Sequence, residues 1–169
     1  MNIFIKFFIG FYLFAVPLLT FSQECENDNA ALQAMGTVKL TITRSDGSLF
    51  TLDAKYANNS ETRAAGFQHV CAERIATTLI LFEFSSLLQP SFHMNNVVAP
   101  LDIAFIDKDG SVESTQRMST YSILLRDKPL YSPSRPVVAA LEAHDGFYAE
   151  HNIDSSSRIT WAVLESIEE

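Results

Sequence analysis

The stretch SFHMNNVVAPLDIAFIDKDGSV, residues 91–112, contains the pattern that decides the fold. Residues 101–106 are apolar except for Asp102, and Asp107-Lys108-Asp109-Gly110 follows them directly. A further segment of strand character, residues 112–118, comes after the glycine. Because Asp-Gly between two such segments is typical of a tight turn, the two segments are expected to form a β-hairpin.

Alternating side chains on either side of this hairpin predict more strands. Residues 38–44 and 49–56 alternate apolar and polar side chains around Ser45-Asp46-Gly47, which predicts a second hairpin. With the two hairpins already placed, about eight short strands are expected in all. The others lie at residues 78–84, 92–94, 137–143 and 159–165.

Helices are expected to be few and short. Asn59 or Ser60 can cap a helix that Gly66 ends, and one helical turn is expected near residues 147–151. No long helix alternates with the strands, which disfavours a doubly wound fold. The sequence therefore predicts a mainly β protein: a compact antiparallel barrel-like or sandwich domain with one or two short helices.

The first 22 residues have the pattern of an N-terminal signal peptide. A single cation, Lys6, precedes the almost unbroken apolar run of residues 7–19. Thr20-Phe21-Ser22 then places small residues where signal peptidase requires them, so cleavage is expected before Gln23. The alternative is a retained N-terminal membrane anchor, although the apolar run is shorter than the roughly 20 residues that a spanning helix needs.

Cleavage at this position divides the chain into three parts. Residues 1–22 are the signal peptide, residues 23–37 are expected to be a flexible acidic segment, and residues 38–169 form a single β-rich domain. The protein is therefore expected to be exported, and to be periplasmic or secreted.

Charge limits the partners. The chain has 12 basic and 20 acidic residues, and removal of Lys6 with the leader leaves a formal net charge of −9. An acidic surface with scattered basic residues excludes nucleic acid as a partner and disfavours an anionic membrane. A small molecule, a saccharide or an envelope protein remains as the expected partner. Membrane contact is expected only through the signal segment before cleavage, and the oligomeric state stays open.

The two cysteines, Cys25 and Cys71, both follow the leader. In an oxidising compartment an even pair is expected to form a disulfide. Such a bridge would fasten the acidic segment to the body of the domain. The alternative is a catalytic or metal-binding thiol.

Asp102 is the polar residue that the first hairpin does not explain. In a strand it shares one face with Ala104 and Ile106, so its carboxylate is expected to be buried at a barrel rim or inside it. An unpaired buried carboxylate costs several kcal/mol, so it needs donors. We predict that Asp102 is ionised and ties residues 95–100 across the barrel mouth, with Arg63 or the Asn96 amide as partner. A ligand-binding or proton-transfer role is the alternative.

His93 and Asn95 share one face of their short strand, which makes His93 a candidate ligand-facing residue. His69, Cys71, His93 and Met94 together would suit a soft metal such as copper. Their spacing matches no metal motif, so the sequence predicts neither a metal nor a cofactor.

Catalytic motifs are missing: the chain has no G-x-S-x-G, P-loop, H-E-x-x-H or C-x-x-C pattern, so catalytic residues are unknown. Asp102 and Glu142 could form a carboxylate pair of the kind that hydrolyses glycosides. The alternative function is therefore a hydrolase of envelope polymers or saccharides that uses Asp102, His93 and Glu142.

The order of short motifs resembles the domain of unknown function 192 family, from about Val38 to the C-terminus. The resemblance rests on Arg63 and Gly66 after the hairpin of residues 38–56, on Phe92, Met94 and Asn96, on Pro100-Leu101-Asp102, and on Leu141-Glu142 with Gly146. It implies a compact, mostly β, barrel-like domain that is exported or membrane-anchored. It implies no activity, because the biochemical role of that family is not established.

The chain departs from the family pattern at two of these motifs, the one around Met94 and the one that begins at Gly66. His93 stands where the family usually has tryptophan, and Asn95 stands where lysine is common. Gly66-Phe67-Gln68 replaces a Gly-Leu-Met segment. An aromatic and cationic surface is thus replaced by a histidine and an amide, so a ligand that the usual tryptophan and lysine contact would be bound differently or not at all.

Together these patterns predict an exported cell-envelope protein, with a non-catalytic binding or accessory module as the main hypothesis. The residues expected to face a ligand or to shape its site are Arg63, His93, Asn95, Asn96, Asp102 and Glu142.

Overall fold

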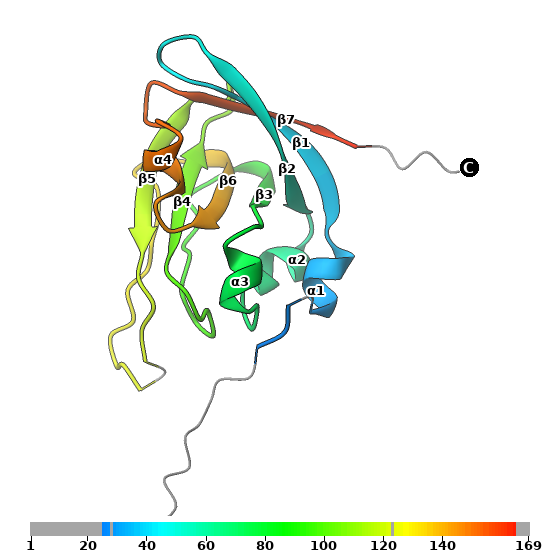
Figure 1. Cartoon of the computed structure of the whole chain (residues 1–169). Coiled ribbons are helices and arrows are strands. Elements are labelled where there is room, and N and C mark those ends of the chain that lie inside the picture. The colour runs from blue at the N-terminus through cyan, green and yellow to red at the C-terminus, as the bar shows by residue number, and fades with distance from the viewer. Residues whose placement is uncertain (1–24, 28, 123, 165–169) are drawn as a thin grey trace, which may run out of the picture.

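The computed structural model describes residues 25–27, 29–122 and 124–164 (Figure 1). The expected signal peptide, residues 1–22, lies outside the described residues and stays a prediction. None of the helices in the described ranges is long and apolar enough to cross a membrane.

Seven strands and four short helices make up the described chain, so the mainly β prediction is confirmed. In chain order they are α1 (Ala30–Ala34), β1 (Gly36–Thr43), β2 (Leu49–Ala57), α2 (Ser60–Ala65), α3 (Ala72–Ile75), β3 (Ile80–Leu88), β4 (Leu101–Ile106), β5 (Val112–Met118), β6 (Val137–His144), α4 (Phe147–Glu150) and β7 (Arg158–Val163). The strand expected at residues 92–94 is instead a single bridge between Phe92 and Tyr131.

The strands form one sheet in the order β5-β4-β6-β3-β2-β1-β7. Both predicted hairpins, β1–β2 and β4–β5, are present. The expectation of an antiparallel sheet is wrong at one place, because β2 and β3 are parallel, with Lys55 opposite Ile80. A parallel pair requires a crossover connection, and the segment with α2 and α3 provides it.

The sheet curls but does not close, so the expected barrel is not formed. Its edge strands, β5 and β7, meet at a single described bridge between Ser111 and Arg158. Two backbone bonds flank this bridge: Val112 N donates to Ser157 O at 3.1 Å, and Ile159 N donates to Gly110 O at 2.8 Å. From Arg158 onward β7 pairs with β1 instead, so contact between the edges stays local.

Both faces of the sheet carry a core. On one face Ala139, Leu141 and Ala143 of β6 pack with the α4 residues Phe147 and Tyr148. The opposite face carries a second cluster, which α1, α2, α3 and their connections cover. Its members include Leu32, Phe67, Ile75, Phe82, Ile103 and Ala140. The central strands are therefore buried on both sides, and every residue of β4 is buried.

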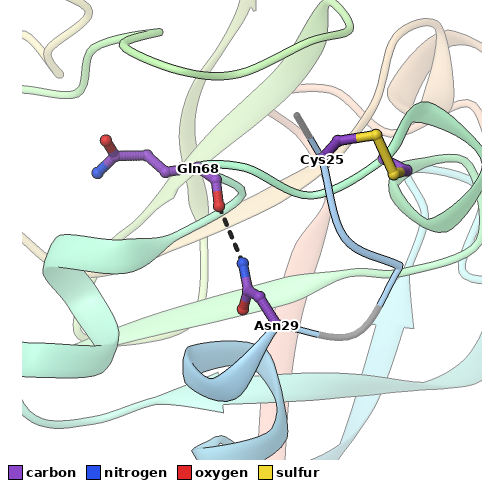
Figure 2. Close-up of a disulfide and its surroundings, with 4 residues drawn as sticks. Cys25, Asn29 and Gln68 are labelled. Atoms are coloured by element: carbon purple, nitrogen blue, oxygen red, sulfur yellow. Dashed lines mark hydrogen bonds between the residues drawn. A yellow bond between two sulfur atoms is a disulfide. The ribbon is translucent and has the colours of Figure 1, made fainter. Parts of the chain in front are cut away.

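The predicted disulfide between Cys25 and Cys71 is confirmed, and it fastens the N-terminal segment beside α2 and α3 (Figure 2). Asn29 adds a second tie, because its side-chain Nδ2 donates to Gln68 O at 3.0 Å while its Oδ1 caps α1 at Leu32 N. The described part of residues 23–37 contains α1 and the start of β1, and the expected flexibility of this segment stays a prediction.

Candidate functional site

A cavity of about 350 Å³ lies among α2, strand β3 and the segment that follows it. Most of its wall is apolar and aromatic, formed by Phe67, Phe82, Phe84, Leu88, Phe92 and Val97. Its polar side chains are Arg63, Gln68, Ser91, His93 and Glu142. The volume is at the lower end of the roughly 300–1,000 Å³ range of small-molecule pockets. We call this cavity the α2 pocket.

Helix α2 sets one wall of the α2 pocket through its two ends. At its start, Asn59 Oδ1 accepts from Thr62 N at 2.9 Å and Thr62 Oγ1 accepts from Asn59 N at 3.4 Å, a reciprocal cap. At its end, Gly66 donates to Thr62 O at 3.3 Å. The predicted helix start at Asn59 or Ser60 and end at Gly66 are both confirmed.

Gly66 has no side chain to cover Phe82 and Glu142, which line the pocket. Its φ is 49°, in the region that favours glycine. A Cβ at this position would lie 3.6 Å from Glu142 Oε2 and 3.5 Å from Phe82 Cζ. Because Gly66 has no side chain, nothing at this position stands between the pocket and Glu142, which is part of the pocket wall.

Glu142 is a buried acid in the middle of the sheet. It lies in β6 between Ile80 of β3 and Ile103 of β4, its cross-strand neighbours, and is only 5% exposed. Its Oε2 atom has no hydrogen-bond partner among the described residues. Burial raises the pKa of Glu142 to about 8, because an apolar environment disfavours the charged carboxylate. At neutral pH this carboxyl is mostly protonated, and it can both donate and accept a hydrogen bond.

Arg63 is half-buried in the pocket wall on α2. Its Nη1 donates to the backbone oxygen of Glu83 at 3.1 Å, and the Glu83 carboxylate accepts a hydrogen bond from Tyr56. Arg63 therefore binds strand β3, and the prediction that it binds Asp102 is wrong.

Asp102 lies on the opposite face of the sheet from Glu142, with Ala104 and Ile106, as the alternation predicted. Its Oδ2 accepts a hydrogen bond from Gly146 N at 2.9 Å. Burial raises the pKa of Asp102, and the Gly146 amide partly offsets that effect. Asp102 thus holds the turn between β6 and α4. The predicted tie to residues 95–100 is wrong, because that loop packs on the other face.

Asn95 and Asn96 form hydrogen bonds that hold the loop before β4. Asn95 Oδ1 accepts from Tyr121 Oη at 3.0 Å and from Lys128 Nζ at 3.1 Å. Asn96 has a φ of 56°, and its Nδ2 donates to Gln68 Oε1 at 3.3 Å. His93 is exposed, lines the pocket, and accepts from Asn95 N at its Nδ1 at 3.3 Å.

Of the six expected site residues, the α2 pocket brings together Arg63, His93 and Glu142, and does not include Asn95, Asn96 or Asp102. Asp102 and Glu142 cannot act as a carboxylate pair on one bond, because the sheet separates their side chains. The aromatic wall residues were not predicted as site residues. The available signal was Glu142 itself, a single acid in the apolar segment VVAALEAH.

The four residues considered for a soft metal are not available as a set. Cys71 is in the disulfide and Met94 is buried in the core. Across the described ranges no three His, Cys, Asp or Glu side chains lie close enough together to hold a metal ion.

Comparison with known proteins identifies a family and a fold. The model of the family DUF192, described as uncharacterized ACR, matches residues 41–161. No curated protein matches the chain.

Two solved structures share the fold. A candidate transcription regulator from Sinorhizobium meliloti has a TM-score of 0.66 and 20% identity, with 77% of this chain and 97% of that chain covered. A protein of unknown function from Novosphingobium aromaticivorans has a TM-score of 0.63 and 23% identity, with 79% and 97% covered.

Proposed function

The chain belongs to the DUF192 family, and we propose that this member is an exported cell-envelope protein that binds a small molecule in the α2 pocket without transforming it. The family description assigns no activity, so the proposal rests on the pocket. The observation that carries it is the buried Oε2 atom of Glu142, which has no hydrogen-bond partner among the described residues and lies at an aromatic-lined cavity. A buried polar atom without a partner costs about 1–3 kcal/mol, and a bound ligand would supply the missing bond.

Export is supported by two features of the sequence and structure. Residues 1–22 have the pattern of a signal peptide. The disulfide between Cys25 and Cys71 fits an oxidising compartment, either the periplasm or the medium. The acidic net charge gives no basis for binding DNA, and at 20% identity the description of the Sinorhizobium protein is no guide to this chain.

The second candidate function is hydrolysis at the same pocket, with Glu142 as general acid or base and His93 in the same pocket wall. The pKa of about 8 favours this candidate, because proton transfer is most efficient when the pKa lies near the working pH. Binding is preferred because the pocket's polar wall groups form no nucleophile and base pair. Ser91 Oγ bonds to Ser132 Oγ at 2.9 Å, and the Nδ1 atom of His93 accepts from Asn95 N.

A ligand screen on the exported protein tests the proposal. Thermal shift should identify compounds that stabilise the protein, and mass spectrometry should recover each of them unchanged. Intact mass should show a chain that begins at Gln23. Ala64→Trp, which fills the pocket, should abolish the shifts, whereas Ala162→Trp on exposed β7 should keep them. Recovery of a cleaved compound would favour the hydrolase, and identical shifts in both variants would place the ligand elsewhere.

A further inference from the structure

We propose that the ligand of the α2 pocket is a small amino-carboxylate with an apolar body, whose amine binds Glu142 and whose carboxylate binds Arg63. This inference rests on the proposed binding function and names its ligand class. It follows from which polar groups of the pocket wall are already bonded, which are not, and what charge each carries.

Most polar groups of the wall have partners within the protein. Gln68 is bonded at both ends of its side-chain amide: Nε2 donates to Ala64 O at 2.8 Å, and Oε1 accepts from Asn96. Ser91 bonds to Ser132, and the Gly66 amide donates to Thr62 O. Glu142 Oε2 differs from these groups, because it is buried and has no partner in the described part of the chain. A ligand that brings a hydrogen-bond donor to Glu142 Oε2 would therefore supply the missing bond.

An amine satisfies Glu142 better than a hydroxyl does. The aromatic rings of Phe82 and Phe92 lie in the wall with their centroids 5.1 Å apart, and ring faces attract cations. A hydroxyl would give a neutral hydrogen bond to the carboxyl. A protonated amine also compensates the charge of an ionised carboxylate, and charge-assisted bonds are roughly twice as strong as neutral ones.

The guanidinium of Arg63 is the reason to expect a negatively charged group on the ligand. Its guanidinium uses Nη1 for the Glu83 backbone oxygen, and a guanidinium has five N–H donors. Burial is the cause of the raised pKa of Glu142, and no pairing with Arg63 offsets it. Arg63 therefore does not stabilise a negative charge on Glu142. A plain amine would bring no counterion for Arg63, which forms no ion pair within the described residues, whereas a carboxylate at the other end of the ligand would pair with it.

Other titratable groups near Glu142 do not replace this pairing. His93 is exposed at the pocket, and Tyr148, packed beneath the opposite face of the sheet, donates its hydroxyl to Leu141 O. The Glu83 carboxylate is bonded to Tyr56.

Binding then moves one proton. The ligand enters with its ammonium group protonated, Glu142 loses its proton to the solvent, and an ammonium–carboxylate ion pair forms. Since the pKa of Glu142 is about 8, most of one proton should be released at pH 7. Affinity should rise roughly tenfold from pH 6 to pH 7, because the ionised carboxylate becomes roughly tenfold more abundant.

Isothermal titration calorimetry of the purified full chain tests the ligand class with three matched probes: δ-aminovalerate, pentylamine and pentanoate. We expect δ-aminovalerate to bind at least about tenfold more tightly than either single-charge probe. Titrations in buffers of different ionisation enthalpy should report the released proton. Glu142→Gln should remove the proton release and the preference over pentanoate. Arg63→Gln should remove the preference over pentylamine. Asp102→Asn, on the opposite face, should change neither.

Several outcomes would overturn the ligand class. Equal affinity for the three probes, no proton release, or an unchanged preference in Glu142→Gln would each do so. Indole, a neutral aromatic probe, separates this failure from that of the proposed function. If indole binds and Ala64→Trp blocks it while δ-aminovalerate does not bind, the class is wrong and the binding function stands. If no probe binds and the ligand screen is also empty, both are wrong.

Discussion

Asp102 and Glu142 are two buried acids in neighbouring central strands, and they differ in what surrounds their oxygens. Asp102 is 9% exposed and Glu142 is 5% exposed. Asp102 accepts a bond from the Gly146 amide, whereas Glu142 Oε2 has no described partner. Burial raises the pKa of both carboxyls, so neither burial nor the direction of the shift distinguishes them. The two acids are distinguished by whether they have a hydrogen-bond partner. Asp102 has one and holds a turn, whereas Glu142 Oε2 is left for a ligand.

The largest expected effect is the dependence of stability on pH through Glu142. An unfolded glutamate is ionised above a pKa of about 4.3, whereas the folded carboxyl keeps its proton to about pH 8. Between these two pKa values the folded state binds one more proton than the unfolded state. The contribution of Glu142 to the free energy of unfolding is therefore fully present below the lower pKa and is lost as the pH rises toward 8. The slope should approach roughly 1.4 kcal/mol per pH unit, or on the order of 4 kcal/mol between pH 5 and pH 8.

Denaturant unfolding of the parent and of Glu142→Gln at each pH isolates this contribution, because Asp102 titrates in both proteins. The difference between their free energies of unfolding should change steadily between pH 5 and pH 8. A difference that does not vary with pH would mean that Glu142 is ionised in the folded protein. The contrast with Asp102 would then not hold.

An effect of similar size is expected on removal of the disulfide, which lies on the Glu142 side of the sheet. Cys25 and Cys71 are 46 residues apart, and a loop of that size predicts a loss of about 4 kcal/mol in Cys25→Ser/Cys71→Ser. Hydrogen exchange shows where the loss acts. The Cys71 amide, which donates to Glu26 O at 3.1 Å, should exchange faster. The Gly146 amide, bonded to Asp102, should be affected only through global unfolding, and equal acceleration of both amides by local opening would contradict this.

The sequence predicts the local parts of this structure better than the distant pairings. Asp46-Gly47 and Asp109-Gly110 define two hairpins, and Asn59 begins a helix, because turn and cap chemistry depends on a few adjacent residues. The parallel pairing of β2 with β3 and the open edges of the sheet depend on residues far apart in the chain. Helices α1 and α3 have five and four residues, too few to show a periodic pattern.

The site was predictable in part for the same reason. Alternation in residues 101–106 correctly places Asp102 on the face of Ala104 and Ile106, but it does not say which loop covers that face. The partner at Gly146 is 44 residues away. The same alternation in β6 places Glu142 with Ala140 on the opposite face. Only the structure shows that Gly66 and the aromatic wall leave a cavity there.

The smallest of these effects should come from the two substitutions that separate charge from hydrogen bonding at Asp102. Asp102→Ala removes the acceptor and leaves the Gly146 N–H unpaired, which should lower stability by roughly 1–3 kcal/mol. Asp102→Asn keeps an acceptor oxygen and should cost less. Unfolding in denaturant at pH 7 measures both, and exchange of the Gly146 amide should accelerate in the alanine variant alone. If both variants are as stable as the parent, Asp102 does not hold the β6–α4 turn, and its buried carboxyl would have to be regarded as a candidate functional group like that of Glu142.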